Sequence, residues 1–73
     1  MINPDKDFIG FLKEYYKPGM KLRLIEMKDD HPVKPGTVGI VQGVDDIGNI
    51  LMKWSNGSTL SLIPKVDKFE EIL

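Results

Sequence analysis

Two pairs of adjacent aspartates are the polar residues whose spacing most suggests chemistry. Asp29-Asp30 and Asp45-Asp46 each lie in a stretch rich in turn-forming residues. If the two stretches meet in the fold, four carboxylates converge and can bind Ca²⁺ or Mg²⁺ or recognise a basic partner. The simpler interpretation is that turns favour Asp, whose side chain bonds to nearby backbone. We predict no metal site, because Asp45-Asp46 lacks the spacing of a calcium loop, and we keep all four as candidate partner-binding residues.

His31 follows Asp30 and is the single histidine of the chain. A carboxylate beside a histidine can orient it for acid–base chemistry near neutral pH. However, the chain has no cysteine, and no serine lies in a nucleophile-elbow motif. Because the sequence supplies no nucleophile, paired base or cofactor cradle, we expect a protein that is not an enzyme and that holds no cofactor.

Several cations accompany the adjacent Tyr15 and Tyr16 between positions 13 and 23. This combination suits single-stranded nucleic acid, because bases stack on aromatic rings while cations follow the phosphates. The alternative is a solvated strand face, on which charges protect the sheet from edge pairing. Lys53 is a further possible member of the group. The candidate nucleic-acid-binding residues are Lys13, Tyr16, Lys17, Lys21 and Arg23.

Trp54 precedes an Asn-Gly pair and has two interpretations. Aromatic side chains on small barrels line grooves that bind peptides. A thin core also needs large side chains, which favours packing of the indole ring in the interior or against a helix. We favour packing in the core or against the helix, and we retain Trp54 as a candidate partner-binding residue.

The composition is that of one small folded domain, residues 1–73. The chain has a formal net charge of −1, with 41% hydrophobic and 29% charged residues. This length allows one domain, and the charge lacks the broad basic excess of duplex-binding domains. Without cysteine, disulfides and thiolate zinc sites are excluded. No apolar run approaches the ~20 residues of a membrane span, and no secretory signal is visible, so we expect a cytoplasmic protein without membrane association.

The N-terminal segment, about residues 4–17, has the pattern of an amphipathic helix. Asn3 as the N-cap and Pro4 in the first helical position predict its start. Pro18-Gly19 predicts its end. The apolar side chains that recur at helical spacing are Phe8, Ile9, Leu12, Tyr15 and Tyr16.

Turn signals divide the rest of the chain into short segments with strand patterns. The Pro-Gly pairs at 18–19 and 35–36 have the residues of type II turns. Asn56-Gly57 predicts a type I′ hairpin, in which both residues have positive φ. Gly39 within a β-branched run indicates sharp strand curvature.

These segments predict a mainly β fold. Strict alternation of apolar and polar residues stops after Leu24, which indicates a bulge or a change of face in the first strand. Short strands at regular spacing are typical of a small barrel or sandwich. We predict a five-stranded SH3-like barrel over about 19–72, with the N-terminal helix packed on it. The expected strands cover about 20–24, 37–44, 49–54, 59–62 and 66–72.

A specific resemblance rests on a series of short motifs. They are Tyr16-Lys17-Pro18-Gly19, Leu22-Arg23-Leu24, Met27-Lys28-Asp29-Asp30, Pro35-Gly36-Thr37-Val38-Gly39, Gly43-Val44-Asp45-Asp46-Ile47-Gly48, Trp54-Ser55-Asn56-Gly57 and Val66-Asp67. With these motifs, about the whole chain resembles a family of short bacterial and phage-encoded proteins catalogued only as a domain of unknown function. That family usually has Asp where this chain has Ser55, so no carboxylate role is expected there. The resemblance supports the SH3-like barrel and implies no established activity.

Together these features predict a non-enzymatic interaction module that binds a protein partner, with an accessory role for a phage or mobile element. The alternative is weak nucleic-acid binding through the basic and aromatic residues. That alternative predicts an affinity that falls as salt is added.

Overall fold

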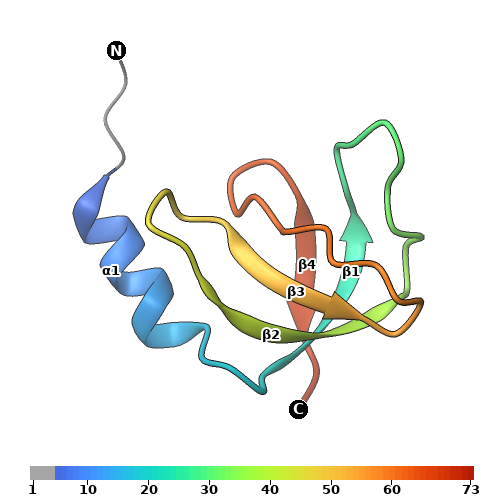
Figure 1. Cartoon of the computed structure of the whole chain (residues 1–73), viewed down its shortest axis with the longest axis horizontal. Coiled ribbons are helices and arrows are strands. Elements are labelled where there is room, and N and C mark those ends of the chain that lie inside the picture. Colours follow the sequence, from blue (N-terminus) through green and yellow to red (C-terminus); the bar gives the residue numbers. More distant parts are fainter. Residues whose placement is uncertain (1–4) are drawn as a thin grey trace.

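A computed structural model describes residues 5–73 as one helix beside a single antiparallel sheet (Figure 1). The strands lie in the order β3-β2-β1-β4. A long loop joins β1 to β2, whereas a tight hairpin joins β2 to β3. The elements are α1 (Lys6–Tyr15), β1 (Lys21–Glu26), β2 (Val38–Val44), β3 (Ile50–Trp54) and β4 (Lys68–Glu71).

The N-cap of α1 is Asp5. Its carboxylate accepts hydrogen bonds from the backbone N–H groups of Asp7 and Phe8, at 3.0 and 3.1 Å. These bonds satisfy N–H groups that have no partner inside the helix. Asn3 and Pro4, which were expected to start the helix, lie outside the described residues.

α1 packs against the β2–β3 hairpin through two buried side chains, Ile9 and Leu12. The contact is close at Gly48 in the hairpin turn, where an added Cβ would lie 3.3 Å from Ile9 Cγ1 and 3.6 Å from Leu12 Cδ1. Gly48 also has a φ of 89°, which glycine adopts without steric cost. The helix therefore covers the hairpin end of the sheet, and the prediction that it packs on the β part is confirmed (Figure 1).

One face of the sheet forms the core. In β1 and β3 every second side chain is buried, as expected for strands with one face inward. Met27 and Val33 join them from the long β1–β2 loop, which folds over the sheet. The core residues are Leu22, Leu24, Met27, Val33, Val41, Ile50, Met52, Trp54 and Leu62.

The predicted strand over residues 59–62 is wrong, and so is the closed five-stranded barrel. The sheet has four strands and is open, and this segment makes one isolated bridge with β3. The Leu60 N–H donates to Ser58 Oγ at 3.2 Å, and the Leu60 carbonyl accepts from Trp54 Nε1 at 2.8 Å. Because side chains occupy both backbone groups of Leu60, these groups are not available for a strand ladder.

The Pro-Gly turns have the predicted geometry, whereas the Asn-Gly turn does not. Gly19 and Gly36 have φ angles of 97° and 90°, as type II turns require. The φ of Asn56 is not positive, so the predicted type I′ turn is wrong. Instead, the Gly57 N–H donates to the Trp54 carbonyl at 2.9 Å, and Gly57 has a φ of 90°. This is a type I turn followed by a left-handed glycine, the usual form of a three-residue hairpin loop.

The indole ring of Trp54 lies against the backbone of β2 at Gly39. Trp54 is 2% exposed, so the predicted interior position is confirmed. A Cβ on residue 39 would lie 2.5 Å from Trp54 Cε3 and 2.8 Å from Met52 Cε. Only glycine at this position leaves room for the ring.

Asp67 is a buried carboxylate that joins two loops. It is 6% exposed, and its two oxygens accept the backbone N–H groups of Lys28 and Ile63, each at 2.8 Å. A buried charge is tolerated when hydrogen bonds replace its hydration. Asp67 therefore ties the start of the β1–β2 loop to the turn that precedes β4.

Gly39→Ala is expected to destabilise the fold by about 1–3 kcal/mol, because the added methyl group overlaps the indole ring. Gly10→Ala in α1 is the matched control. A Cβ there meets nothing within 4 Å, and alanine favours a helix over glycine by up to ~1 kcal/mol. Urea denaturation measures the free energy of unfolding of each variant. A Gly39→Ala variant as stable as the parent chain would contradict this packing.

Asp67→Ala is expected to lower the free energy of unfolding by about 2–4 kcal/mol, because it leaves two backbone N–H groups without their acceptors. Asp67→Asn keeps the shape but loses one acceptor oxygen, and we expect an intermediate loss. Asp30→Ala, at an exposed position of the same loop region, is the control and should change stability little. If Asp67→Asn unfolds at the same urea concentration as the parent chain, Asp67 does not tie the two loops together.

Candidate functional site

The two acidic pairs lie on separate loops. Asp29-Asp30 is in the long β1–β2 loop and Asp45-Asp46 is in the β2–β3 turn, and Figure 1 shows these loops at opposite ends of the molecule. Among residues 5–73, no three acidic or histidine side chains come together in a group that could hold a metal ion. The two stretches therefore do not meet, and the four carboxylates do not converge.

Two of these aspartates stabilise their own turns. Asp29 Oδ1 accepts the His31 N–H at 2.9 Å. Asp45 Oδ1 accepts the N–H groups of Ile47 and Asn49, at 3.1 and 2.8 Å. These are the local bonds for which turns favour Asp. The turn interpretation therefore accounts for both residues.

Asp46 forms an ion pair with Lys13 of α1. Lys13 Nζ lies 2.7 Å from Asp46 Oδ1. The hydrogen bond from Lys13 and its positive charge lower the pKa of the Asp46 carboxyl below its usual value. The pair is exposed, and such pairs add little to stability because water and salt screen them. Lys13, a candidate for nucleic-acid binding, and Asp46, a candidate for partner binding, thus neutralise each other where α1 meets the β2–β3 hairpin.

The five candidate nucleic-acid-binding residues do not share one surface. Tyr16 is half-buried and packs edge-on against Phe69, with ring centroids 5.9 Å apart. Burial, and then the negative charge of Glu71, raise the pKa of Tyr16. Lys17 is exposed in the turn after α1. With Lys13 paired to the hairpin turn, only Lys21 and Arg23 of the group lie side by side on the sheet.

Lys21 and Arg23 belong to a surface on the side of the sheet away from the core. Lys21 and Arg23 of β1 pair directly with Ile40 and Val38 of the neighbouring β2. On the other side of β2, Ile40 pairs directly with Lys53 of β3. Directly paired residues of neighbouring strands point to the same face. We call this surface, made of Lys21, Arg23, Val38, Ile40 and Lys53, the outer sheet face.

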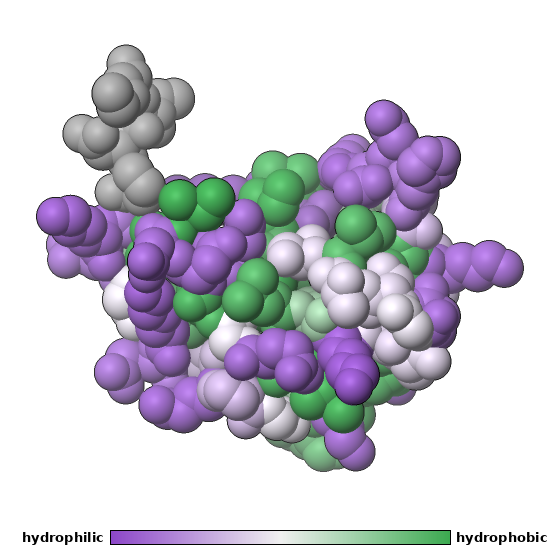
Figure 2. All heavy atoms as spheres, viewed as in Figure 1, coloured by the Kyte–Doolittle hydropathy of each residue, from purple (hydrophilic) through white to green (hydrophobic). Residues whose placement is uncertain are grey.

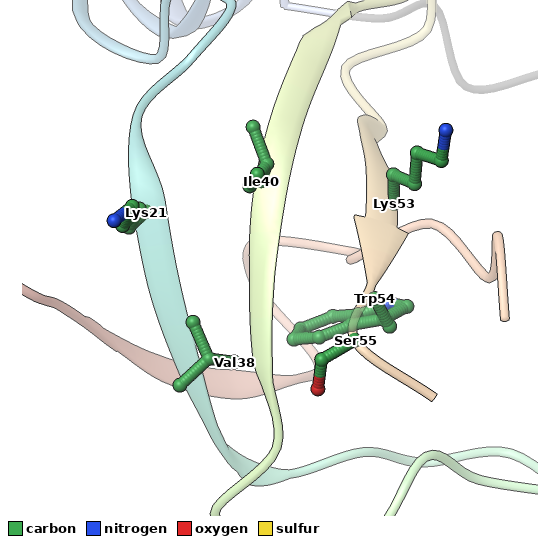
Figure 3. A pocket seen from close by; sticks show the side chains of 6 residues that line it. All are labelled: Lys21, Val38, Ile40, Lys53, Trp54 and Ser55. Carbon is green, nitrogen blue, oxygen red and sulfur yellow. The ribbon is translucent and has the colours of Figure 1, made fainter. Parts of the chain in front are cut away.

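A groove of about 320 Å³ lies on the outer sheet face (Figure 3). Val38 and Ile40 of β2 form its apolar floor, and Ile40 is 41% exposed. Figure 3 shows this floor between Lys21 on β1 and Lys53 on β3. The volume is at the low end of the roughly 300–1,000 Å³ of small-molecule sites, so it suits one or two side chains. The lining residues are Lys21, Val38, Ile40, Lys53, Trp54 and Ser55.

The cations of the outer sheet face differ in their pairing. Arg23 Nη1 lies 3.2 Å from Glu70 Oε1 on β4. Within residues 5–73, no carboxylate oxygen lies within 4.0 Å of Nζ of Lys21 or Lys53. The two lysines that flank the apolar floor therefore carry charges without a local partner in the described part of the chain.

Comparison with known proteins identifies the family of the chain. Residues 5–72 match the family described as a domain of unknown function, DUF4314. The chain belongs to this family. The resemblance predicted from the sequence motifs is confirmed to that extent. Neither the curated proteins nor the solved structures contain a match to the chain.

The helix of this DUF4314 chain is short. Over residues 5–73, no helix is long and apolar enough to cross a membrane. Figure 2 shows hydrophilic side chains over α1 and around the rim, with apolar residues between them over the middle of the molecule.

Sequence reasoning missed the apolar floor of the groove in this DUF4314 chain. Val38 and Ile40 were placed in a strand, but only the cations of the first strand were assigned to an outer face. The available signal was alternation, because Gly39 and Val41 face inward and their neighbours in β2 must face outward. Strand pairing, which places Ile40 beside Lys21, was not available from a single sequence.

Lys13→Gln is expected to raise the pKa of the Asp46 carboxyl toward its usual value, because the hydrogen bond and the charge that lower it are removed. Since this pKa is lowered in the folded state, the pair contributes stability above the ordinary carboxyl pKa. The contribution is lost as pH falls through the lowered pKa. NMR titration of the Asp46 carboxyl measures both values, with Lys17→Gln as the control. An Asp46 pKa that does not move in Lys13→Gln would rule out the pair in solution.

Proposed function

We propose that the chain is a non-enzymatic module that binds a protein partner through the outer sheet face. The observation that supports this is the groove with an exposed apolar floor of Val38 and Ile40. Contiguous exposed apolar surface, rimmed by polar residues, commonly marks a protein-interaction site. The opposite face of the same sheet is filled by the core, so the outer sheet face is the one that can receive a partner.

The apolar surface extends beyond the groove. Leu51 precedes Lys53 by two residues in β3, so both side chains point outward, and Leu51 is 39% exposed. This adds a third apolar side chain to the surface formed by Val38 and Ile40. The polar rim consists of Lys21, Lys53 and the Arg23–Glu70 pair.

The acidic pairs give weaker support to a binding role. Asp29 and Asp45 are engaged in their turns, and Asp46 is paired with Lys13. Asp30 is exposed and remains accessible to a partner. Trp54 is a core residue that borders the groove, so we assign it the role of supporting β2 beneath the apolar floor.

Nucleic-acid binding, the alternative function, has less support than protein binding. Stacking of bases needs aromatic faces beside the cations. Tyr16 packs toward Phe69, and Trp54 is buried against Gly39. The cations of the outer sheet face therefore stand beside aliphatic side chains.

Affinity capture with single-residue variants tests the proposed surface. Ile40→Thr keeps a β-branched residue in the strand but removes the apolar contact. Ile47→Thr makes the same change in the β2–β3 turn, where Ile47 is 68% exposed, and serves as the control. We expect a defined set of proteins, identified by mass spectrometry from an extract of the encoding organism, to bind the parent chain and Ile47→Thr but not Ile40→Thr.

A second variant separates the outer sheet face from the acidic loops. Asp30→Asn combined with Asp46→Asn removes one carboxylate from each acidic pair without touching the turn-forming Asp29 and Asp45. We expect capture to survive this double change. If the double variant loses capture while Ile40→Thr retains it, the partner binds the acidic loops and not the outer sheet face, and the proposal is wrong. Circular dichroism of each variant verifies that it is folded.

A further inference from the structure

We infer that the groove on the outer sheet face binds an acidic segment of a partner protein, with an apolar side chain seated between carboxylates. This inference rests on the proposed function and adds the chemistry of the partner. It follows from the order of side chains across three strands, the pairing of the nearby charges, and the size of the groove.

The order of side chains places one apolar residue between two ammonium groups. Lys21 is the direct cross-strand partner of Ile40, and Ile40 is the direct partner of Lys53. Neighbouring strands lie roughly 5 Å apart, so the two lysine Cα atoms flank Ile40 at roughly 10 Å from each other. A side chain resting on Ile40 therefore has an ammonium group within reach on either side.

Other cations on and near the sheet lie beside a carboxylate, whereas the two beside the groove do not within residues 5–73. Arg23 pairs with Glu70, and Lys68 and Lys28 both approach Glu26, at 3.8 and 4.0 Å. No such pair involves the two lysines of the groove within residues 5–73. Complementary charge on a partner guides association and selects against partners of like charge. The groove thus favours carboxylates and disfavours a basic segment.

The groove volume limits what enters it. About 320 Å³ above Val38 and Ile40 accommodates one or two side chains rather than a bulky ligand. An apolar side chain such as leucine removes the exposed methyl groups of this floor from water, which is favourable. The segment we infer therefore combines one apolar anchor with flanking Asp or Glu residues.

Fluorescence anisotropy with labelled synthetic peptides tests the inference. The first probe is a short peptide of Asp and Glu residues with leucine at its centre. In the second probe, serine replaces the leucine. In the third probe, Asn and Gln replace the acidic residues. An oligouridine of the same charge is the fourth probe. We expect the first probe to bind most tightly, and its affinity to fall as salt screens the lysines.

Two double variants locate the binding. Lys21→Gln with Lys53→Gln is expected to weaken the first probe about tenfold, since each exposed charge contact contributes modestly. Lys6→Gln with Lys65→Gln changes the net charge equally at exposed positions outside the groove and should leave the affinity unchanged. Ile40→Thr should also weaken the first probe.

The outcomes separate the inference from the proposed function. If the acidic and amide peptides bind equally, or if the two double variants have the same affinity, the inference of an acidic partner is wrong. In that case, capture of proteins that depends on Ile40 would still support the proposed protein-binding module. If the oligouridine binds more tightly than the peptide with the same lysine dependence, the ligand is nucleic acid. A concentration-dependent dimer in sedimentation that Ile40→Thr abolishes would assign the groove to a second copy of the chain.

Discussion

The contact between the Trp54 ring and the bare backbone at Gly39 is the constraint on which the sheet depends. It lets the indole ring lie flat over β2, because any side chain at residue 39 would displace the ring. The same indole holds the following segment by donating from Nε1 to the Leu60 carbonyl. That hydrogen bond holds Leu60 against the Trp54 ring, and it occupies the Leu60 carbonyl, which would otherwise be an acceptor for strand pairing. The indole therefore fills part of the core and, together with Ser58, occupies the backbone groups of Leu60 that a fifth strand would use.

The outer sheet face is the geometric consequence of that packing. Because Gly39 and Val41 face the core, alternation turns Val38 and Ile40 outward. A small chain buries a limited fraction of its surface, so some apolar exposure is ordinary. β-Branched residues also favour strands, but threonine meets that preference without presenting an apolar side chain to water. Strand formation alone therefore does not explain isoleucine at position 40, whereas the contact that we propose on this face would.

The parts of the fold that depend on local pattern were predictable, and the parts that depend on distant contacts were not. The strands β2 and β3, the bulge after Leu24 and the Pro-Gly turns follow from alternation and turn chemistry, and the register shift in β1 confirms the bulge. The segment 59–62 has the same alternation, but the backbone groups of Leu60 bond to the side chains of Ser58 and Trp54. Likewise, whether the two acidic loops meet depends on strand order, which a single sequence does not contain.

The positive and negative charges are separated along the sequence, but the fold brings several of them together in ion pairs. The sequence gathers cations at residues 13–23 and acidic pairs at residues 29–30 and 45–46, which suggests two opposite poles. The fold instead joins Lys13 to Asp46 and Arg23 to Glu70, so much of the apparent separation disappears. With a net charge of −1, a positive surface cannot arise from a general excess of cations. It arises where pairing is absent, and Lys21 and Lys53 stand on either side of an exposed apolar residue. Local order across the sheet, rather than composition, therefore distinguishes this surface, which we propose as the one that selects a partner.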